Sequence, residues 1–286
     1  MKKKLTRRQM IGRTVLALGA AAAGYGFLIE PRRIVIERIE MRLRRLPGEF
    51  DGFRIAQISD IHYGPYMSSS FVRKAVEEIN QLQPDLVALT GDFISHPLGK
   101  NNSPEGAEMH APPCADALRG LRPAYGSYAV LGNHDHWNHP GIVKKSLEAA
   151  GFPVLVNQAV ALEKDNARLW LVGVDDVMEN KADLENALKR VPASEATLLL
   201  AHEPDFADHA AKFPIDLQIS GHSHGGQVRI PWLGAPVLPL LGKKYPMGRY
   251  RVGNMQLYTN RGFGVINPPV RFNCPPEITL ITLRAR

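Results

Sequence analysis

The sequence predicts an α/β fold, and two kinds of segment carry this prediction. Short, continuous apolar runs at 86–90 and 198–201 have the length and even hydrophobicity of strands that are covered on both faces. Other segments repeat apolar residues at helical spacing, as Val72, Val76 and Ile79 do. At 286 residues and 44% hydrophobic, the chain can bury a sizeable core, and its length permits one large domain or two small ones.

The positive charge is concentrated near the N-terminus. Residues 1–46 hold twelve Lys or Arg against three Glu, a net charge of +9, which leaves −2 of the total +7 for the remaining 240 residues. The body of the protein therefore lacks the basic surface typical of nucleic-acid-binding domains, and we expect no nucleic acid partner.

The first 29 residues have the layout of an export signal. A cationic stretch with paired Arg7 and Arg8 precedes a 16-residue apolar run, 14–29, and the arrangement resembles the twin-arginine type. Residues 21–23, all Ala, offer a cleavage site, but a retained membrane anchor is equally compatible. We expect residues 1–29 to be a signal or anchor that engages the twin-arginine export machinery and the membrane surface, and residues 30–286 to form the folded domain. This places the protein at the outer face of the inner membrane, in the periplasm or in the cell envelope.

The first half of the domain predicts strands separated by helices. Residues 33–46 alternate well enough to predict a charged edge strand with one slip of register, and a cationic amphipathic helix on the membrane is the alternative. Further strands are predicted at 53–59, 86–90 and 128–131, and helices at 71–82 and 142–150. Residues 95–114 are rich in Pro, Asn and Gly and predict a mobile loop.

The second half continues in the same way. Weaker strands are predicted at 154–156 and 169–172, a helix at 184–190, and strands at 198–201, 216–219, 255–259 and 278–283. The apolar, proline-rich stretch 228–241 either forms a rim for a lipid tail or bilayer, or is an ordinary buried loop. The two cysteines, Cys114 and Cys274, lie in no metal-type cluster, so we expect free or buried thiols rather than a disulfide.

Polar residues follow five of the predicted strands. They are Asp60 and His62, Asp92, Asn133 and His134, His202, and His222 with His224. In extended geometry residues i and i+2 project to the same side, so each of the two closely spaced pairs is expected to deliver both of its side chains to one place. Because ligand groups gather at the carboxyl ends of strands in open α/β sheets, we expect all eight to converge.

The mixture of side chains predicts a metal centre. Carboxylates and an amide oxygen beside several imidazoles, without a thiolate, suit Mn, Fe or Zn better than an all-oxygen Ca or Mg site. Eight positions are too many for one tetrahedral ion and suit two ions that share a carboxylate. Such a pair activates water and clamps phosphate oxygens, which favours phosphoester hydrolysis.

These residues resemble the motif set of the calcineurin-like metallophosphoesterases. The matching motifs occur in order between residues 54 and 224: Asp60-Ile61-His62, Gly91-Asp92, Gly132-Asn133-His134-Asp135, His202 and Gly221-His222-Ser223-His224. The resemblance implies a four-layer αββα sandwich of two mixed sheets. It also implies an enzyme that hydrolyses a phosphodiester or pyrophosphate bond by attack of a hydroxide that bridges two divalent metal ions.

The resemblance also implies a role for each residue. One metal ion would take Asp60, His62 and His224, and the other Asn133, His202 and His222. Asp92 would bridge the two ions. His134 would be a non-ligand histidine that contacts the phosphate and protonates the leaving oxygen, which is general acid catalysis.

The substrate is narrowed by two further details. Gly225-Gly226-Gln227 after His224, together with the leader, resembles the exported bacterial branch that includes cell-envelope phosphodiesterases and the UDP-2,3-diacylglucosamine pyrophosphohydrolases of lipid A biosynthesis. The segment 91–95 lacks the Asp-Arg pair that protein Ser/Thr phosphatases carry there, which argues against a phosphoprotein. A metal-dependent binding scaffold without hydrolytic activity is the alternative, and His134 argues against it.

Three residues outside the motifs have two interpretations each. Arg261 either contacts a substrate phosphate as a bidentate donor or is a solvated arginine in a turn. His136 and His139 either support the site from behind or lie on the surface.

Overall fold

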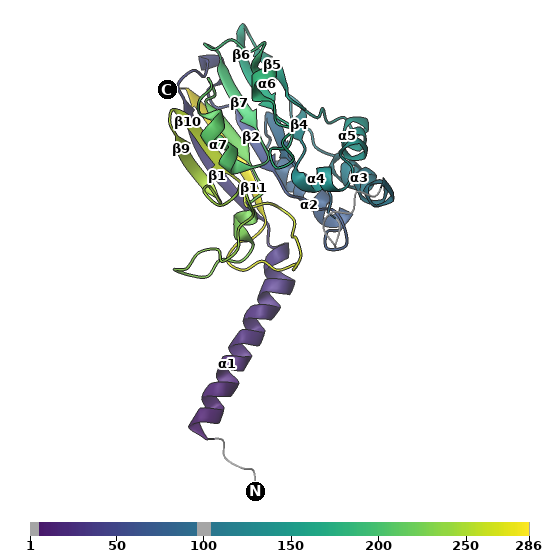
Figure 1. Ribbon diagram of the computed structural model, residues 1–286, viewed down its shortest axis with the longest axis vertical. Coiled ribbons are helices and arrows are strands. Elements are labelled where there is room, and N and C mark those ends of the chain that lie inside the picture. The colour runs from purple at the N-terminus through teal and green to yellow at the C-terminus, as the bar shows by residue number, and fades with distance from the viewer. Residues whose placement is uncertain (1–5, 96–103, 286) are drawn as a thin grey trace.

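The structure, a computed structural model, describes residues 6–95 and 104–285. Two sheets pack against each other, and a long helix, α1, projects from one end of the domain (Figure 1). The first sheet has the order β1-β11-β2-β3-β4, and the second has the order β5-β6-β7-β8-β10-β9. Each sheet contains parallel and antiparallel pairs, so both are mixed.

The strands of the first sheet are β1 (Val35–Leu43), β11 (Glu277–Ala285), β2 (Arg54–Ile58), β3 (Leu86–Thr90) and β4 (Ser127–Val130). Those of the second are β5 (Gln158–Lys164), β6 (Ala167–Gly173), β7 (Ala196–Leu200), β8 (Leu217–Ser220), β10 (Met255–Thr259) and β9 (Gly248–Val252). The helices are α1 (Arg7–Gly24), α2 (Ser69–Gln81), α3 (Pro104–Leu118), α4 (Asn133–Trp137), α5 (Pro140–Ala149), α6 (Leu184–Leu188) and α7 (Ala207–Ala210). Neighbouring strands β2, β3 and β4 run parallel, as do β6, β7, β8 and β10.

Alternate residues of the buried strands pack into different layers. Leu198 and Leu200 of β7 belong to the core between the two sheets, whereas Leu199 packs towards α6 and α7. In β3, Leu86 faces the other sheet, and Leu89 packs against α2, α3 and α5. The even apolar runs therefore arise because each sheet is covered on both faces, and the four-layer α/β sandwich is confirmed.

The edge strand β1 is confirmed, but its predicted slip of register is wrong. It pairs with β11 in nine consecutive positions from Val35 to Leu43. Ile36 packs towards the helices, while Ile39 and Met41 pack between the sheets. The apolar residues thus move from one face of a regular strand to the other between Ile36 and Ile39. The alternative of an amphipathic helix is wrong.

The mobile loop predicted for 95–114 is wrong for its described second part. Residues 104–118 form α3, and the remainder, 96–103, lies outside the described residues. The Pro and Asn content obscured a helical repeat of small side chains, because Ala107, Ala111 and Cys114 are buried at helical spacing. Cys114 and Cys274 are both free and buried, as predicted.

Other local predictions need smaller corrections. The strand predicted at 154–156 is reduced to a single bridge between Val154 and Ala129. Strand β5 begins four residues later, and the edge strand β9 was not predicted. Both missed strands are partly exposed, with a single buried residue in β5 and none in β9, so neither has the long run of large buried apolar residues that identified the central strands.

The helix α1 is exposed along its whole length, but the segment that follows it is packed into the domain. Gly26 and Glu30 are buried. The stretch Arg7–Arg32 is long and apolar enough to cross a membrane, a criterion that a signal sequence also meets. The predicted division at residue 29 stays a prediction, although the packed segment begins before it.

Candidate metal centre

Every predicted ligand directly follows a strand, and all of these strands end at one edge of the sandwich. Asp60 and His62 follow β2, Asp92 follows β3, and Asn133 with His134 begins α4 after β4. From the second sheet, His202 follows β7, and His222 with His224 follows β8. The parallel course of these strands brings their carboxyl ends together, as predicted.

The extended geometry expected for the two i, i+2 pairs is wrong. Asp60, His62, His222 and His224 all have positive φ, between 49° and 67°. Left-handed backbone is unfavourable for residues with a Cβ and is concentrated at functional sites. Because β2 ends at Ile58 and β8 at Ser220, these side chains reach the site from tightly turned loops rather than from the strands themselves.

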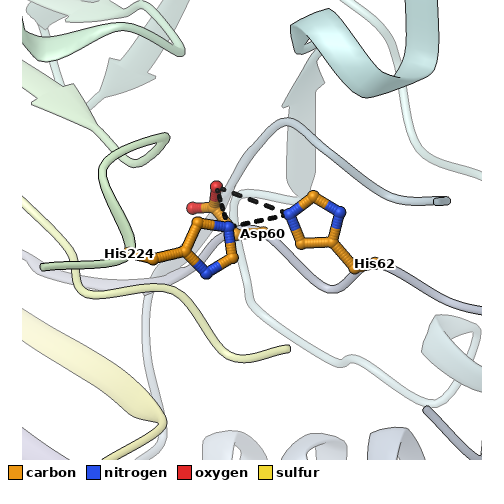
Figure 2. A group of neighbouring side chains, drawn as sticks. All are labelled: Asp60, His62 and His224. Carbon is orange, nitrogen blue, oxygen red and sulfur yellow. Dashed lines mark hydrogen bonds and ion pairs between the residues drawn. The ribbon is translucent and has the colours of Figure 1, made fainter. Parts of the chain in front are cut away.

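One group of three side chains matches the first predicted ligand set. Asp60, His62 and His224 offer atoms that all lie within 4.8 Å of one another. Figure 2 shows the three side chains pointing towards a common point, with Nε2 of His62 2.8 Å from Nε2 of His224 and Nε2 of His224 3.4 Å from Oδ1 of Asp60. Two unprotonated imidazole nitrogens this close repel each other, whereas a shared cation would satisfy both.

A second group contains Asp92, His202 and His222, whose ligand atoms also lie within 4.8 Å of one another. Oδ2 of Asp92 lies 3.2 Å from Nε2 of His202 and 3.6 Å from Nε2 of His62. Asp92 is therefore placed between the two groups, as a bridging ligand must be.

Hydrogen bonds to backbone carbonyl oxygens orient the rings of two predicted histidine ligands. Nδ1 of His202 donates to the carbonyl oxygen of Thr90 at 2.7 Å, so its Nε2 lone pair faces the cluster. Nε2 of His222 donates to the carbonyl oxygen of Leu240 at 2.7 Å, so its Nδ1 is the free acceptor. Such bonds fix the tautomer and direction of metal-binding histidines.

Asn133 is buried next to the second group. Its Oδ1 has no hydrogen-bond partner in the described part of the chain, and neither does Nε2 of His202. Unpartnered buried acceptors cost free energy, and the two atoms come from the same predicted ligand set. The donor set thus fits divalent cations, and the unsatisfied atoms are the ones that ligation would satisfy.

The surroundings hold three of the histidines and Asp92 in the charge state that ligation requires, whereas the pKa values of His202 and Asp60 shift the other way. Burial would lower the pKa of His202, but the charge of Asp92 outweighs it and raises that pKa, and burial raises the pKa of Asp60. Burial lowers the pKa of His62, His222 and His224, with His222 at about 4, so these rings are neutral at neutral pH. Burial alone would raise the pKa of Asp92, but the neighbouring His202 and His134 outweigh it and hold that pKa well below its ordinary value. Neutral imidazoles and an ionised carboxylate are the ligand forms.

Glycines leave room for this packing at two positions. A Cβ at Gly132 would lie 2.3 Å from Oδ1 of Asp92, and one at Gly221 would lie 2.4 Å from Oδ2 of Asp60. Both distances are too short for any side chain. The motif glycines are therefore required by the close approach of the backbone to the carboxylates.

His134 lies at the edge of the cluster and is only half-buried. Its ring packs edge-on against His62 at 4.6 Å between centroids, and its backbone N–H donates to Oδ1 of Asp92 at 2.8 Å. A ligand atom of His134 also lies within 4.8 Å of those of His62 and Asp92. The residue is thus held beside the site and is partly accessible, and its role as an acid stays a prediction.

The residues outside the motifs are placed as follows. The guanidinium of Arg261 donates to Glu277 and, at 2.6 Å, to Glu37, so two carboxylates already bind it; its contact with substrate stays a prediction. Nε2 of His136 lies 2.7 Å from Oδ1 of Asp175, and both side chains are mostly buried. Nδ1 of His139 is buried, and the residue has a φ of 93°.

Arg271 is a structurally important residue that the sequence analysis did not identify. Its side chain is completely buried, and its guanidinium donates to the carbonyl oxygens of Arg261, Gly262, Gly264 and Cys274. The Sγ of Cys274 in turn donates to the carbonyl oxygen of His224 at 3.2 Å. Arg271 therefore holds together the C-terminal loop that supports this ligand.

Known proteins resemble this chain over most of its length. Residues 53–226 match the family described as calcineurin-like phosphoesterase. The chain is 36% identical to the uncharacterized metallophosphoesterase YkuE of Bacillus subtilis, with 99% of each chain covered. It is 31% identical to the phosphodiesterase YaeI of Escherichia coli, with 98% of this chain and 99% of the relative covered.

More distant relatives add to the same result. The UDP-2,3-diacylglucosamine pyrophosphatase LpxG of Chlamydia trachomatis is 26% identical, with 94% of each chain covered. The crystal structure of a dimetal phosphatase from Danio rerio shares the fold with a TM-score of 0.50 at 14% identity, over 74% of this chain and 88% of that one. The alternative of a non-hydrolytic scaffold gains no support. The chain belongs to the calcineurin-like phosphoesterase family and is a hydrolytic enzyme of the metallophosphoesterase type.

Proposed function

We propose that this enzyme cleaves a phosphodiester or pyrophosphate bond in a lipid-linked substrate at the outer surface of the membrane. The observation that carries the hydrolytic part is the pair of ligand groups with Asp92 between them. Asp60, His62 and His224 would hold one ion, and Asn133, His202 and His222 the other. Imidazole, carboxylate and amide ligands suit Mn, Fe or Zn.

Hydrolysis would need both the bound ions and a proton donor supplied by the chain. Bound divalent ions would supply Lewis-acid chemistry, which polarises the phosphoryl group and allows water to attack at neutral pH. His134 is the half-buried imidazole beside the predicted ligands, and it would give a proton to the leaving oxygen. The hydrogen bond from its backbone to Asp92 ties the position of the acid to that of the bridging carboxylate.

A cavity beside the site supports a lipid-linked substrate. It has a volume of about 780 Å³, and its apolar wall includes Phe27, Leu28 and Phe71, with Arg32 and Lys74 also lining it. A small neighbouring cavity shares Pro65, Tyr66 and Val265 with it and also contacts His62. An apolar groove with two cations that leads to a phosphohydrolase centre suits an acyl chain followed by a phosphate.

A larger cavity, of about 1190 Å³, lies away from the predicted ligands. It is lined by Arg42, Arg45, Asp216 and Arg249 among others, and none of the predicted ligands or His134 lines it. Its arginines are partly used within the protein, since Arg45 pairs with Asp216.

The orientation and the substrate class have separate support. Lys2, Lys3 and Lys4 before α1, with Arg7 and Arg8 in its first turn, favour the cytoplasmic side, and the domain would then lie outside. The name of LpxG, a UDP-2,3-diacylglucosamine pyrophosphatase, supplies the specific nucleotide-linked lipid to be tried.

The test is phosphorus NMR of the full, manganese-loaded chain in detergent with UDP-2,3-diacylglucosamine, and with bis(p-nitrophenyl) phosphate as the soluble comparison. The full chain is used because Gly26 and Glu30 are buried in the domain. Release of UMP and lipid phosphate supports the proposal. Cleavage of the soluble diester alone keeps a phosphodiesterase and removes this lipid nucleotide, and no cleavage of either by metal-loaded protein overturns the proposal.

A further inference from the structure

The loop 230–241, here called the tip loop, exposes large apolar side chains to solvent. Trp232 is fully exposed, and Leu233, Val237 and Leu240 are 71%, 74% and 62% exposed. The other two tryptophans of the chain, Trp137 and Trp170, are partly buried and donate hydrogen bonds to Glu179 and Glu195. An exposed cluster of this kind in a monomer indicates an interaction surface.

The exposure of Trp232 is built into the backbone. Residues Ile230 and Gly234 exchange two hydrogen bonds, at 2.8 and 2.9 Å, which close a tight turn with Trp232 at its tip. Trp232 has a φ of 65°, which is unfavourable for a residue with a side chain. The turn therefore points the indole away from the domain. Exposing this apolar ring to water costs free energy, and burial of the ring against a binding partner would offset that cost.

The tip loop and the end of α1 are fixed to the same short segment. At the base of the loop, Arg229 donates its backbone N–H to Phe272 at 2.8 Å. At the end of α1, Gly26 accepts from the backbone N–H of Arg271 at 3.0 Å, and the ring of Tyr25 packs edge-on against Phe272. The two features are thus held relative to each other by neighbouring residues.

Figure 1 shows where this attachment places them. The tip loop extends from the end of the domain from which α1 leaves, at about the level of the last turns of that helix. Phe27, Leu28 and Ile29 are also exposed at that level of the chain, at 45%, 64% and 56%. A flat surface perpendicular to the long axis of the molecule can therefore contact both the tip loop and residues 27–29.

The residues around these two features indicate that this plane is the surface of a lipid bilayer. The stretch Arg7–Arg32 is apolar and long enough to cross a bilayer, and 6% of its most apolar window is buried in the protein. Exposed cations, Arg32, Arg33 and Lys243, flank the two apolar features. Tryptophan is enriched at the boundary between acyl chains and headgroups, and cations there attract anionic lipids.

We propose that the tip loop inserts Trp232 and Leu233 into the headgroup boundary of an anionic phospholipid bilayer, beside the point where α1 enters it. The tip loop is also attached directly to the candidate metal centre, because the carbonyl oxygen of Leu240 accepts a hydrogen bond from Nε2 of His222. Docking of the loop therefore sets the distance of the site from the membrane surface more closely than α1 alone would. This surface is independent of which phosphoester the enzyme cleaves.

The test uses tryptophan fluorescence of the full chain reconstituted into phosphatidylglycerol vesicles whose acyl chains carry bromine, which quenches nearby indoles. The wild type is compared with W232F, which leaves Trp137 and Trp170 as the background. We expect the wild type to be quenched more than W232F, and more strongly by bromine near the headgroups than by bromine near the bilayer centre. The difference should shrink in neutral phosphatidylcholine, because the cations then lack a partner.

A matched variant separates the tip loop from the anchor. F27W in the W232F background places the reporter at the end of α1, and its quenching shows that this helix has entered the bilayer. If that indole is quenched while the wild type and W232F behave alike, the docking of the loop is overturned. The proposal also fails if neither is quenched, or if Trp232 emission shifts only with protein concentration, which would assign the loop to a contact with a second copy.

Discussion

Oδ2 of Asp92 lies 3.2 Å from Nε2 of His202, although Asp92 follows β3 of the first sheet and His202 follows β7 of the second. The contact joins the two halves of the sandwich at the metal centre. A bridging carboxylate in this position would keep the two ligand groups in register. The carboxylate that the proposed chemistry requires therefore also links residues that follow strands of the two sheets.

Replacing Asp92 by Asn should remove the charge from this bridge and leave its size unchanged. We expect the ions bound per chain, measured by plasma mass spectrometry, to fall from two towards none, and kcat/KM to fall by at least about 100-fold. The control is D116N, since Asp116 is 56% exposed on α3. Full occupancy of both sites in D92N would show that Asp92 does not bridge them.

Replacing His134 by Gln should leave the ions bound and slow the reaction. We expect kcat to fall by about 10²- to 10⁴-fold for a substrate with an alkoxide leaving group. For a p-nitrophenolate leaving group, which departs without a proton, the loss should be less than about 10-fold. The comparison variant is H209Q, because His209 is an exposed residue of α7. Equal losses with both leaving groups would rule out general acid catalysis by His134.

Replacing Arg271 by Lys should destabilise the loop that supports His224. Lysine keeps the charge but cannot reach the four carbonyl oxygens that the planar guanidinium binds, and buried acceptors would lose their donors. We expect the free energy of unfolding, from urea titration, to fall by about 3 kcal/mol. R251K serves as the control, because the exposed Arg251 donates to the carbonyl oxygen of Gly253, two residues away in the chain. An unchanged urea midpoint in R271K would contradict this role.

The sequence identified the metal centre because its signal is local. Two pairs of predicted ligands can each be recognised within three residues at the end of a predicted strand: Asp60 with His62, and His222 with His224. Parallel strands then bring such ends together whatever their order in the chain. The left-handed backbone at these residues was not foreseen, because φ at a residue with a side chain is set by tertiary contacts that no short window contains.

The parts that sequence reasoning missed depend on contacts between distant residues. Glu30 accepts from the backbone N–H of Cys274, a separation of 244 residues, and nothing near Glu30 predicts its burial. Arg271 is buried against the usual preference of arginine. The helix α3 was missed for the opposite reason, because two internal prolines, Pro112 and Pro113, concealed a helix that tertiary packing maintains.

The pair His136 and Asp175 should make stability depend on pH. Burial alone would lower the pKa of His136, but the hydrogen bond and charge of Asp175 outweigh it and raise that pKa above the ordinary value of 6.5. The same bond lowers the pKa of Asp175 although burial opposes it. The pair therefore stabilises the fold fully between pH 3.8, the ordinary pKa of an aspartate such as Asp175, and pH 6.5, the ordinary pKa of His136, and its contribution falls as the pH drops from 3.8 through the lowered pKa of Asp175. Its contribution is lost as the pH rises through the raised pKa of His136, because the unfolded chain then binds fewer protons than the native one.

Removing either partner should abolish this dependence. At pH 6 we expect H136Q and D175N each to lower the free energy of unfolding by about 1 to 2 kcal/mol relative to the wild type. The deficit should shrink as the pH rises towards 9, because the wild type then also lacks the charged pair. Urea titrations at several pH values measure it, and H209Q provides a histidine replacement outside the pair. A deficit that stays constant from pH 6 to 9 would mean that the two residues pack together without exchanging charge.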